Sequence, residues 1–209
     1  MSQLYFVKTP FWLKWIYQDC IWKFSKKSNA IYLTFDDGPH PIATPFVLEE
    51  LKKHNAKATF FCIGKNVVLY PEIYKRIIEE GHSVGNHTYH HLNGWKTKDD
   101  VYMNDIYQAK LIIDSNLFRP PYGRISRFQL ALLKKLKFNL KPIMWSILSG
   151  DFDHSITKET CAQNVIKKSK FGDIIVFHDS EKAFEKMSYA LPRVLTHFSK
   201  QQFEFKKIA

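Results

Sequence analysis

Short apolar runs, each followed at once by polar residues, are the sequence feature that most constrains the fold of this chain. Segments with helical periodicity separate these runs along the 209 residues. Alternating strands and helices are typical of a mainly parallel sheet covered by helices. Because the carboxyl ends of parallel strands face the same side, polar residues that follow them converge into one site. The polar clusters span residues 36–39, 86–91, 119–123, 149–152 and 178–179.

The apolar runs predict about seven parallel strands, and we expect an α/β fold built as a distorted or incomplete (β/α) barrel. A complete (β/α)8 barrel takes roughly 250 residues, so this chain is short for one. No linker or repeat interrupts the sequence. We therefore expect one domain over residues 30–209, with residues 1–29 as a helical extension packed on the barrel. The pattern predicts strands at residues 31–35, 58–63, 82–85, 117–119, 143–146, 173–177 and 203–205, and helices at residues 44–54, 71–80, 98–115, 127–136, 158–169 and 192–200.

The composition indicates a globular protein with a basic surface. Lys and Arg number 31 against 20 Asp and Glu, which gives a formal charge of +11. A basic surface favours anionic partners, but the basic residues are scattered in pairs without a run of five or more. Recognised nucleic-acid-binding motifs are absent from the sequence. We interpret the charge mainly as solvated helix faces and expect no nucleic-acid partner.

The N-terminal segment is aromatic and apolar, but Lys14, Gln18 and Asp19 interrupt it. It lacks the apolar core and cleavage site of a secretion signal, and no run approaches the roughly 20 residues that span a bilayer. We therefore expect a cytoplasmic or membrane-peripheral location in a bacterium. Packing on the core is the simpler interpretation of this helix, and docking on a membrane surface through its tryptophans is the alternative. The oligomeric state stays open.

Three histidines within five residues suggest a metal site. His87 and His91 are four residues apart, a spacing that on a helical turn places both imidazoles on one face. His90 could ligate instead, although it is adjacent to His91. Two imidazoles and one carboxylate leave coordination positions open for water and substrate, as catalytic zinc sites require. Other divalent ions such as cobalt or nickel also accept these ligands.

The carboxylate is expected from the adjacent pair Asp36 and Asp37, which leave the predicted strand at residues 31–35. Two like charges side by side repel each other unless a cation or a proton intervenes. Because consecutive strand residues point apart, the two carboxylates can serve two different roles. The alternative is that they form a turn and a helix cap before Gly38 and Pro39.

Arg119 and His178 are two further candidates for a chemical role. Arg119 precedes two prolines and a Tyr-Gly turn, so its guanidinium is expected on a rigid loop, where it would orient a carboxylate. A structural salt bridge is its alternative role. His178 ends an apolar strand, and Asp151 could hold its ring and raise its pKa, which would make it a general acid.

Taken in order, these motifs resemble those of the polysaccharide deacetylase family, also called NodB-homology domains or carbohydrate esterase family 4. The resemblance extends over residues 31–205, nearly the whole chain. It rests on Thr34-Phe35-Asp36-Asp37-Gly38-Pro39, His87-Thr88-x-x-His91, Arg119-Pro120-Pro121-Tyr122-Gly123 and the late His178.

The resemblance implies a metal-dependent hydrolase that removes N-acetyl groups from amino sugars of a glycan, such as peptidoglycan or chitin-type oligomers. It also implies a zinc ion, held by Asp37, His87 and His91. The implied catalytic roles are the general base for Asp36, its orienting partner for Arg119, the general acid for His178, the tether of that acid for Asp151, and a backbone N–H that stabilises the oxyanion for Tyr122.

The fourth motif departs from the family pattern Asp-x-x-Asp-Trp. Leu148 and Phe152 stand at two of its positions, while Asp151 is retained. We expect catalysis to survive because Asp151 is retained, whereas the pocket wall built by Phe152 leaves the substrate preference open. The alternatives are a deformylase or deacylase of a lipid-linked amino sugar, an amidase of another non-peptide C–N bond, and a non-catalytic glycan-binding module.

Overall fold

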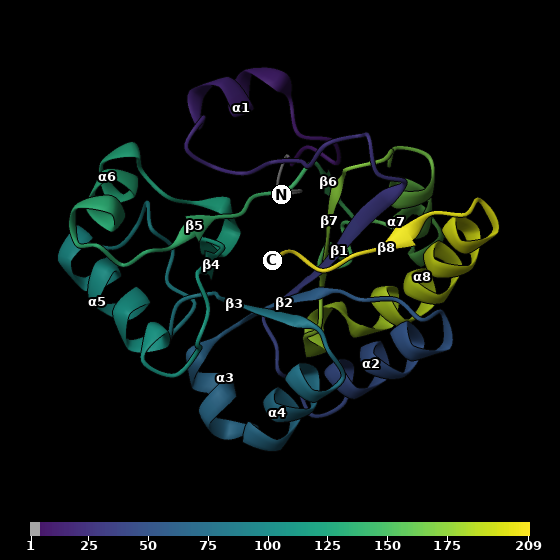
Figure 1. Ribbon diagram of the computed structural model, residues 1–209, viewed down its shortest axis with the longest axis horizontal. Helices are drawn as coiled ribbons and strands as arrows, with labels where there is room; N and C mark the ends of the chain where they lie inside the picture. The colour runs from purple at the N-terminus through teal and green to yellow at the C-terminus, as the bar shows by residue number, and fades with distance from the viewer. Residues whose placement is uncertain (1–4) are drawn as a thin grey trace.

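The computed structural model describes residues 5–209 and shows a curled sheet surrounded by helices (Figure 1). Its strands are β1 (Ala30–Asp36), β2 (Thr59–Cys62), β3 (Ser83–Asn86), β4 (Leu117–Phe118), β5 (Lys141–Pro142), β6 (Ile147–Leu148), β7 (Ile174–His178) and β8 (Glu204–Phe205). The sheet order is β5-β4-β3-β2-β1-β7-β6, and β8 pairs with β1 off this path. Every named pair of strands is parallel. The prediction of an incomplete barrel with about seven parallel strands is therefore confirmed.

Helices cover the outside of the sheet because each presents an apolar stripe to it. The long helix near the C-terminus, for example, buries Met187, Leu191, Val194 and Phe198 on one side. The central strand is buried along nearly its whole length, as expected for a parallel sheet with helices packed on it. The helices are α1 (Phe11–Ile16), α2 (Ala43–Lys53), α3 (Gly64–Leu69), α4 (Pro71–Glu79), α5 (Asp99–Lys110), α6 (Arg127–Lys135), α7 (Lys158–Ile166) and α8 (Glu181–Lys200).

The N-terminal segment lies along the seam between β5 and β6, the two ends of the sheet path (Figure 1). Lys8 forms an antiparallel bridge with Ile147 of β6, and the Leu148 N–H donates to the Val7 carbonyl oxygen at 2.8 Å. On the other side of the seam, Ile21 forms a parallel bridge with residue 143, just after β5. Backbone groups at both ends of the sheet thereby find partners. The division of the chain at residue 30 stays a proposal.

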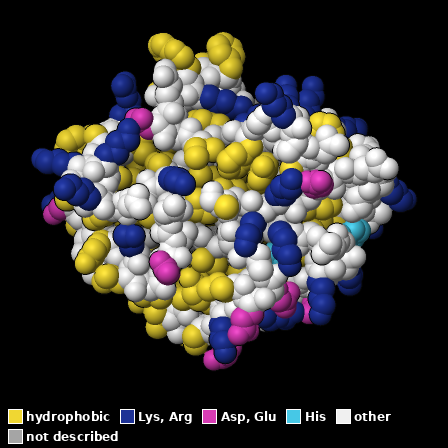
Figure 2. Space-filling view, in the orientation of Figure 1, with side chains coloured by type: hydrophobic (Ala, Val, Ile, Leu, Met, Phe, Trp, Pro, Cys, Tyr) yellow, Lys and Arg dark blue, Asp and Glu magenta, His cyan; other side chains and the backbone are white. Residues whose placement is uncertain are grey.

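Helix α1 has an exposed apolar side. Phe11 is 84% exposed and Trp15 72% exposed, whereas Leu13 and Tyr17 pack partly against a buried cluster. Figure 2 shows hydrophobic side chains projecting at the edge where α1 lies, and Lys and Arg spread over the rest of that face. Docking of this helix on a membrane surface stays a prediction. Within residues 5–209 no helix combines the length and the apolarity needed to cross a bilayer.

The strand predicted at residues 143–146 is wrong. β5 and β6 lie on either side of this segment, which crosses the seam. Its carbonyl groups serve a side chain instead of a strand: the Ile143 and Met144 oxygens accept hydrogen bonds from the Arg119 guanidinium at 3.0 and 3.1 Å. Ile143 is fully buried, which accounts for the apolar run. The backbone of the run, however, binds the side chain of Arg119.

Three helices also differ from the prediction. The helix predicted from Pro192 begins eleven residues earlier, at Glu181, and continues through the proline. Proline removes one backbone donor, but the buried face of α8 extends over both halves of the helix. α3, only six residues long, was not predicted because a single turn and a half shows no clear periodicity. α5 ends at Lys110, before the predicted residue 115.

Candidate active site

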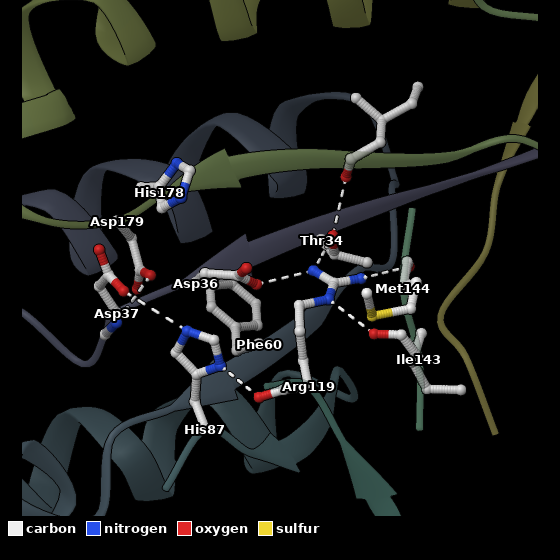
Figure 3. Close-up of polar contacts among 12 residues, drawn as sticks. Thr34, Asp36, Asp37, Phe60, His87, Arg119, Ile143, Met144, His178 and Asp179 are labelled. Atoms are coloured by element: carbon white, nitrogen blue, oxygen red, sulfur yellow. Dashed lines mark hydrogen bonds and ion pairs between the residues drawn. The ribbon is translucent and has the colours of Figure 1, made fainter. Parts of the chain in front are cut away.

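The polar clusters meet at the carboxyl ends of the strands, as predicted. Asp36 is the last residue of β1 and lies beside His178, the last residue of β7. His87 and Arg119 follow β3 and β4 directly, and Asp151 follows β6 closely. Adjacent parallel strands therefore bring together residues that are up to 142 positions apart in the sequence (Figure 3).

Asp37, His87 and His91 form a compact group of possible metal ligands. One ligand atom from each lies within 4.8 Å of the other two. The Asp37 Oδ1 atom is 3.6 Å from His87 Nε2 and 3.1 Å from His91 Nε2. Burial favours the neutral acid, yet the imidazoles of His87 and His91, followed by the charge of His178, hold the pKa of Asp37 well below its usual range. The carboxylate is thus available as an anionic ligand.

Hydrogen bonding fixes the tautomer of His87. Its Nδ1 lies 2.7 Å from the Arg119 carbonyl oxygen, which can only accept, so Nδ1 carries the proton. In the neutral ring the Nε2 atom therefore turns a lone pair toward Asp37 Oδ1, which is buried without a hydrogen-bond partner. Two acceptors that face each other repel unless a cation or a proton lies between them. A divalent ion fits these donors, and a backbone carbonyl that orients the distal ring nitrogen is typical of ligating histidines.

His90 does not join this group. Its Nδ1 lies 2.6 Å from Asp105 Oδ1, and the other oxygen of Asp105 accepts the backbone N–H groups of Tyr89 and His90. The predicted helical turn is also wrong, since residues 87–91 form a loop in which Thr88 and His91 have φ of 62° and 59°. The two ligand histidines converge because the loop turns back, and helical spacing plays no part.

Arg119 holds Asp36 in place from inside the barrel. The guanidinium is fully buried, and its Nη1 donates to Asp36 Oδ1 at 2.7 Å and to Thr34 Oγ1 at 2.6 Å. Its Nε and Nη2 donate to the backbone of the seam, and its Cζ atom lies 4.0 Å from the centre of the Phe61 ring. Figure 3 shows Arg119 between Asp36 on one side and the two carbonyl groups on the other. A salt bridge and an orienting contact were predicted as alternatives for Arg119. The contact with Asp36 has the geometry of both.

Asp179 is a site residue to which sequence reasoning gave no role. It is fully buried, its Oδ1 accepts the Gly38 N–H at 3.1 Å, and its Oδ2 accepts the Thr44 hydroxyl at 2.5 Å. A Cβ on Gly38 would lie 2.0 Å from Asp179 Oδ2. Asp179 therefore fixes the turn that carries Asp37. The sequence shows that Asp179 follows His178, but it gives no sign of the partners Thr44 and Gly38, which lie 135 and 141 residues away.

His178 is held by Asp151 through two hydrogen bonds. The His178 backbone N–H donates to Asp151 Oδ2 at 2.7 Å, and the ring Nδ1 lies 2.8 Å from Asp151 Oδ1. Burial alone would lower the pKa of His178, but the charge and hydrogen bond of Asp151 raise it to about 10. The raised pKa favours the protonated form of the imidazole. The Phe152 ring stands edge-on to it, with centroids 5.2 Å apart.

Tyr122 lies on the other side of the cluster. Its ring centre is 4.6 Å from that of His91, and its side chain is 60% exposed. Its φ is 59°, and Asp37 has φ of 80°. Thr88 and His91 also have positive φ, so several residues of one site adopt the left-handed conformation. Such conformations cost about 1–3 kcal/mol each and gather at functional sites.

The carboxyl ends of a curled parallel half-barrel thus carry a buried Asp-Arg pair, an Asp-His pair and a His-His-Asp group. The comparison with known families assigns the chain to one of them. The family model described as polysaccharide deacetylase matches residues 23–140, more than half of the chain. The chain belongs to the polysaccharide deacetylase family.

Individual relatives agree with this assignment. The chain is 38% identical over 180 residues to a peptidoglycan-N-acetylglucosamine deacetylase of Bacillus cereus, covering 82% of this chain and 63% of that protein. It is 34% identical over 164 residues to a chitooligosaccharide deacetylase of Azorhizobium caulinodans, covering 75% and 77%. The crystal structure of the Bc1960 peptidoglycan N-acetylglucosamine deacetylase with a hydroxamate ligand superposes with a TM-score of 0.86 at 32% identity, covering 96% and 95%. The chain thus spans less than two thirds of the first of these relatives.

Proposed function

We propose that this protein is a metal-dependent deacetylase that hydrolyses the N-acetyl group of amino sugars in a glycan. The observation that carries the proposal is the Asp37 carboxylate oxygen, buried without a hydrogen-bond partner, which faces the Nε2 atoms of two histidines. Relatives named as peptidoglycan and chitooligosaccharide deacetylases support the substrate class.

Asp37, His87 and His91 would hold the ion. A bound divalent ion supplies Lewis-acid polarisation of the amide carbonyl and lowers the pKa of water. Two neutral imidazoles and one carboxylate are the donors of many catalytic zinc sites. We propose zinc as the ion, while cobalt and nickel also accept this donor set.

Asp36 and His178 would move the protons. Asp36 takes the proton of the attacking water, and the fixed hydrogen bond from Arg119 keeps its other lone pairs aimed at the reaction centre. His178, protonated because Asp151 raises its pKa to about 10, delivers a proton to the departing nitrogen. Water adds to the carbonyl carbon, the C–N bond breaks, and acetate and a free amine leave.

The oxyanion would be stabilised in part by the backbone N–H of Tyr122. The left-handed conformation at this residue turns the peptide unit relative to the preceding prolines. Preorganised N–H groups of this kind typically contribute 10²–10³-fold to the rate. This role, like those of the other site residues, is a proposal from the geometry and the family.

Product analysis tests the function. The protein, supplied with zinc, is incubated with N-acetylglucosamine oligomers, with peptidoglycan fragments and with a lipid-linked formylated amino sugar. The proposal expects acetate and free amine from at least one of the first two. Formate release from the lipid-linked sugar, with no acetate from any oligomer, would favour the deformylase alternative and contradict the proposal. Binding of a glycan without turnover would favour a non-catalytic module.

A further inference from the structure

We propose that Tyr5 is a positioning residue of the active site, which holds the ring of His178 in place through Phe152. This inference rests on the proposed function, in which His178 protonates the departing nitrogen. The ring centres of Tyr5 and Phe152 are 5.2 Å apart, and those of Phe152 and His178 are also 5.2 Å apart. The N-terminal segment, which was expected only to pack on the barrel, thus reaches the proposed general acid through one intervening side chain.

Backbone pairing with β6 brings Tyr5 to this place. The bridge between Lys8 and Ile147 of β6 is antiparallel. Because the two segments run in opposite directions, each step from Lys8 toward the N-terminus is a step toward the carboxyl end of β6. Tyr5 therefore lies beside the loop that follows β6 and carries Phe152.

This loop leaves room for the Tyr5 side chain because it contains a glycine. Gly150 has φ of 83°, and a Cβ at this position would lie 2.6 Å from the Tyr5 hydroxyl oxygen and 2.9 Å from Ile156 Cδ1. A residue with a side chain would both strain the backbone and displace the tyrosine. Tyr5 therefore packs directly on the backbone of the residue before Asp151, the residue that binds His178.

His178 needs a contact besides its hydrogen bonds to Asp151. The Asp151 carboxylate lies 2.8 Å from Nδ1 of the ring, so Nε2 is the nitrogen left to face a substrate. Rotation about the Cβ–Cγ bond of histidine has broad minima, and a hydrogen bond tolerates about 30° of misalignment. The Phe152 ring, edge-on at 77°, limits the rotation that the hydrogen bond allows.

Phe152 is held in turn by Tyr5. Phe152 lies on a loop and is only partly buried, so its own surroundings leave it more than one rotamer. The Tyr5 ring packs on it with an angle of 55° between the two planes. Without the tyrosine this part of the Phe152 ring would face water, and the ring would move away from His178.

The test compares two bonds that need the acid to different degrees. An amide nitrogen must take up a proton to leave, whereas 4-nitrophenolate leaves without one. The zinc-loaded protein is assayed on the N-acetylated glycan that it hydrolyses best and on 4-nitrophenyl acetate, counting only hydrolysis that a chelator abolishes. Tyr5→Ala is expected to lower kcat for the glycan about tenfold, because small misplacements of a catalytic group are costly. KM for the glycan and the rate on the ester should stay within about twofold.

Two further variants show whether the aromatic ring at this position matters. Tyr5→Phe keeps the ring and should keep kcat for the glycan within about twofold of the unchanged protein. Phe6→Ala is the matched control, since it removes the neighbouring ring, which is 58% exposed and packs against Trp12. It should change neither reaction.

A double variant tests whether Tyr5 acts through Phe152. Phe152→Ala is expected to lower kcat for the glycan at least as much as Tyr5→Ala does. Adding Tyr5→Ala to Phe152→Ala should then cause no further loss, because residues that act through one contact are not additive. A further tenfold loss in the double variant, equal losses on glycan and ester in Tyr5→Ala, or no loss on the glycan would overturn the positioning role.

Crystal structures of the unchanged protein and of Tyr5→Ala separate this proposal from the proposed function. If the unchanged protein releases no acetate from any glycan, the deacetylase is refuted and the two structures decide the positioning role. Displacement of the Phe152 and His178 rings in Tyr5→Ala would support it. An unchanged arrangement of both rings would overturn it, even in a protein that is an active deacetylase.

Discussion

The Asp36 carboxylate is held by Arg119 at 2.7 Å and lies next to the candidate metal ligand Asp37 in the chain. The two neighbours have different surroundings, which separates their roles. Asp36 is tied to a buried cation, whereas one oxygen of Asp37 has no hydrogen-bond partner. In the proposed mechanism, a single residue step at the end of β1 therefore divides proton transfer from metal binding.

Replacing the proposed base tests this division. Asp36→Asn keeps the shape of the side chain but cannot take up a proton at neutral pH. We expect kcat for acetate release to fall by about 10²–10⁴-fold, with the metal content unchanged. Asp100→Asn, an exposed aspartate on α5, is the control. Activity of Asp36→Asn within tenfold of the unchanged protein would remove Asp36 as the base.

The pH dependence tests the Asp151–His178 pair. A general acid must be protonated, so activity falls as the pH rises through its pKa. Asp151 raises the pKa of His178 to about 10, and Asp151→Asn removes the negative charge responsible. The alkaline limb of kcat/KM should therefore move to lower pH. Asp153→Asn, whose carboxylate accepts from Ser155 instead, should leave the limb in place. An unmoved limb in Asp151→Asn would contradict the assignment.

At the scale of elements, the turn after β1 is closely packed against the residue that follows β7. Gly38 leaves no room for a side chain because Asp179 fills the space a Cβ would need, at 2.0 Å. Asp179 in turn holds Thr44 at the start of α2. Strand, turn and helix are thus locked together around Asp37.

Gly38→Ala is expected to displace this turn and weaken metal binding at least tenfold, with a loss of stability of about 1–3 kcal/mol. The measurements are zinc titration and denaturant unfolding. Gly81→Ala is the matched control: its φ is 82°, so alanine is strained there, but the nearest atom to its Cβ is Lys57 Nζ at 3.4 Å. We expect Gly81→Ala to lower stability and leave zinc affinity unchanged. Equal zinc affinity in both variants would show that Asp179 does not position Asp37.

Elements with clear hydrophobic periodicity could be predicted from the sequence. Elements whose structure depends on tertiary contacts could not. β1 and β7 were predicted within one residue, because buried parallel strands are continuous apolar runs. Residues 143–146 look like such a run, but the Ile143 and Met144 carbonyl groups bind Arg119, which lies 24 and 25 positions earlier in the sequence. The convergence of Asp37, His87 and His91 was predicted because the segments that carry them follow strands, although the helical turn assumed for His87 and His91 is wrong. Asp179 had no local signal.

At the scale of the whole molecule, the ion would join segments far apart in the sequence. Asp37 follows β1, whereas His87 and His91 follow β3. A ligand that binds only the folded state adds stability, about 2.7 kcal/mol at a concentration 100 times its Kd. For a chain of 209 residues, we expect zinc to raise Tm by about 5–10 °C. The rise should be absent in Asp37→Asn, and an equal rise in that variant would place the ion elsewhere.

Metal content measured together with acetate release tests the central claim most directly. The protein is analysed for bound metal, assayed on N-acetylated glycan, treated with a chelator, and assayed again before and after zinc is restored. The account predicts about one ion per chain, loss of acetate release on chelation and recovery with zinc, with Asp37→Asn failing on every count. Full acetate release by the metal-free protein would contradict it.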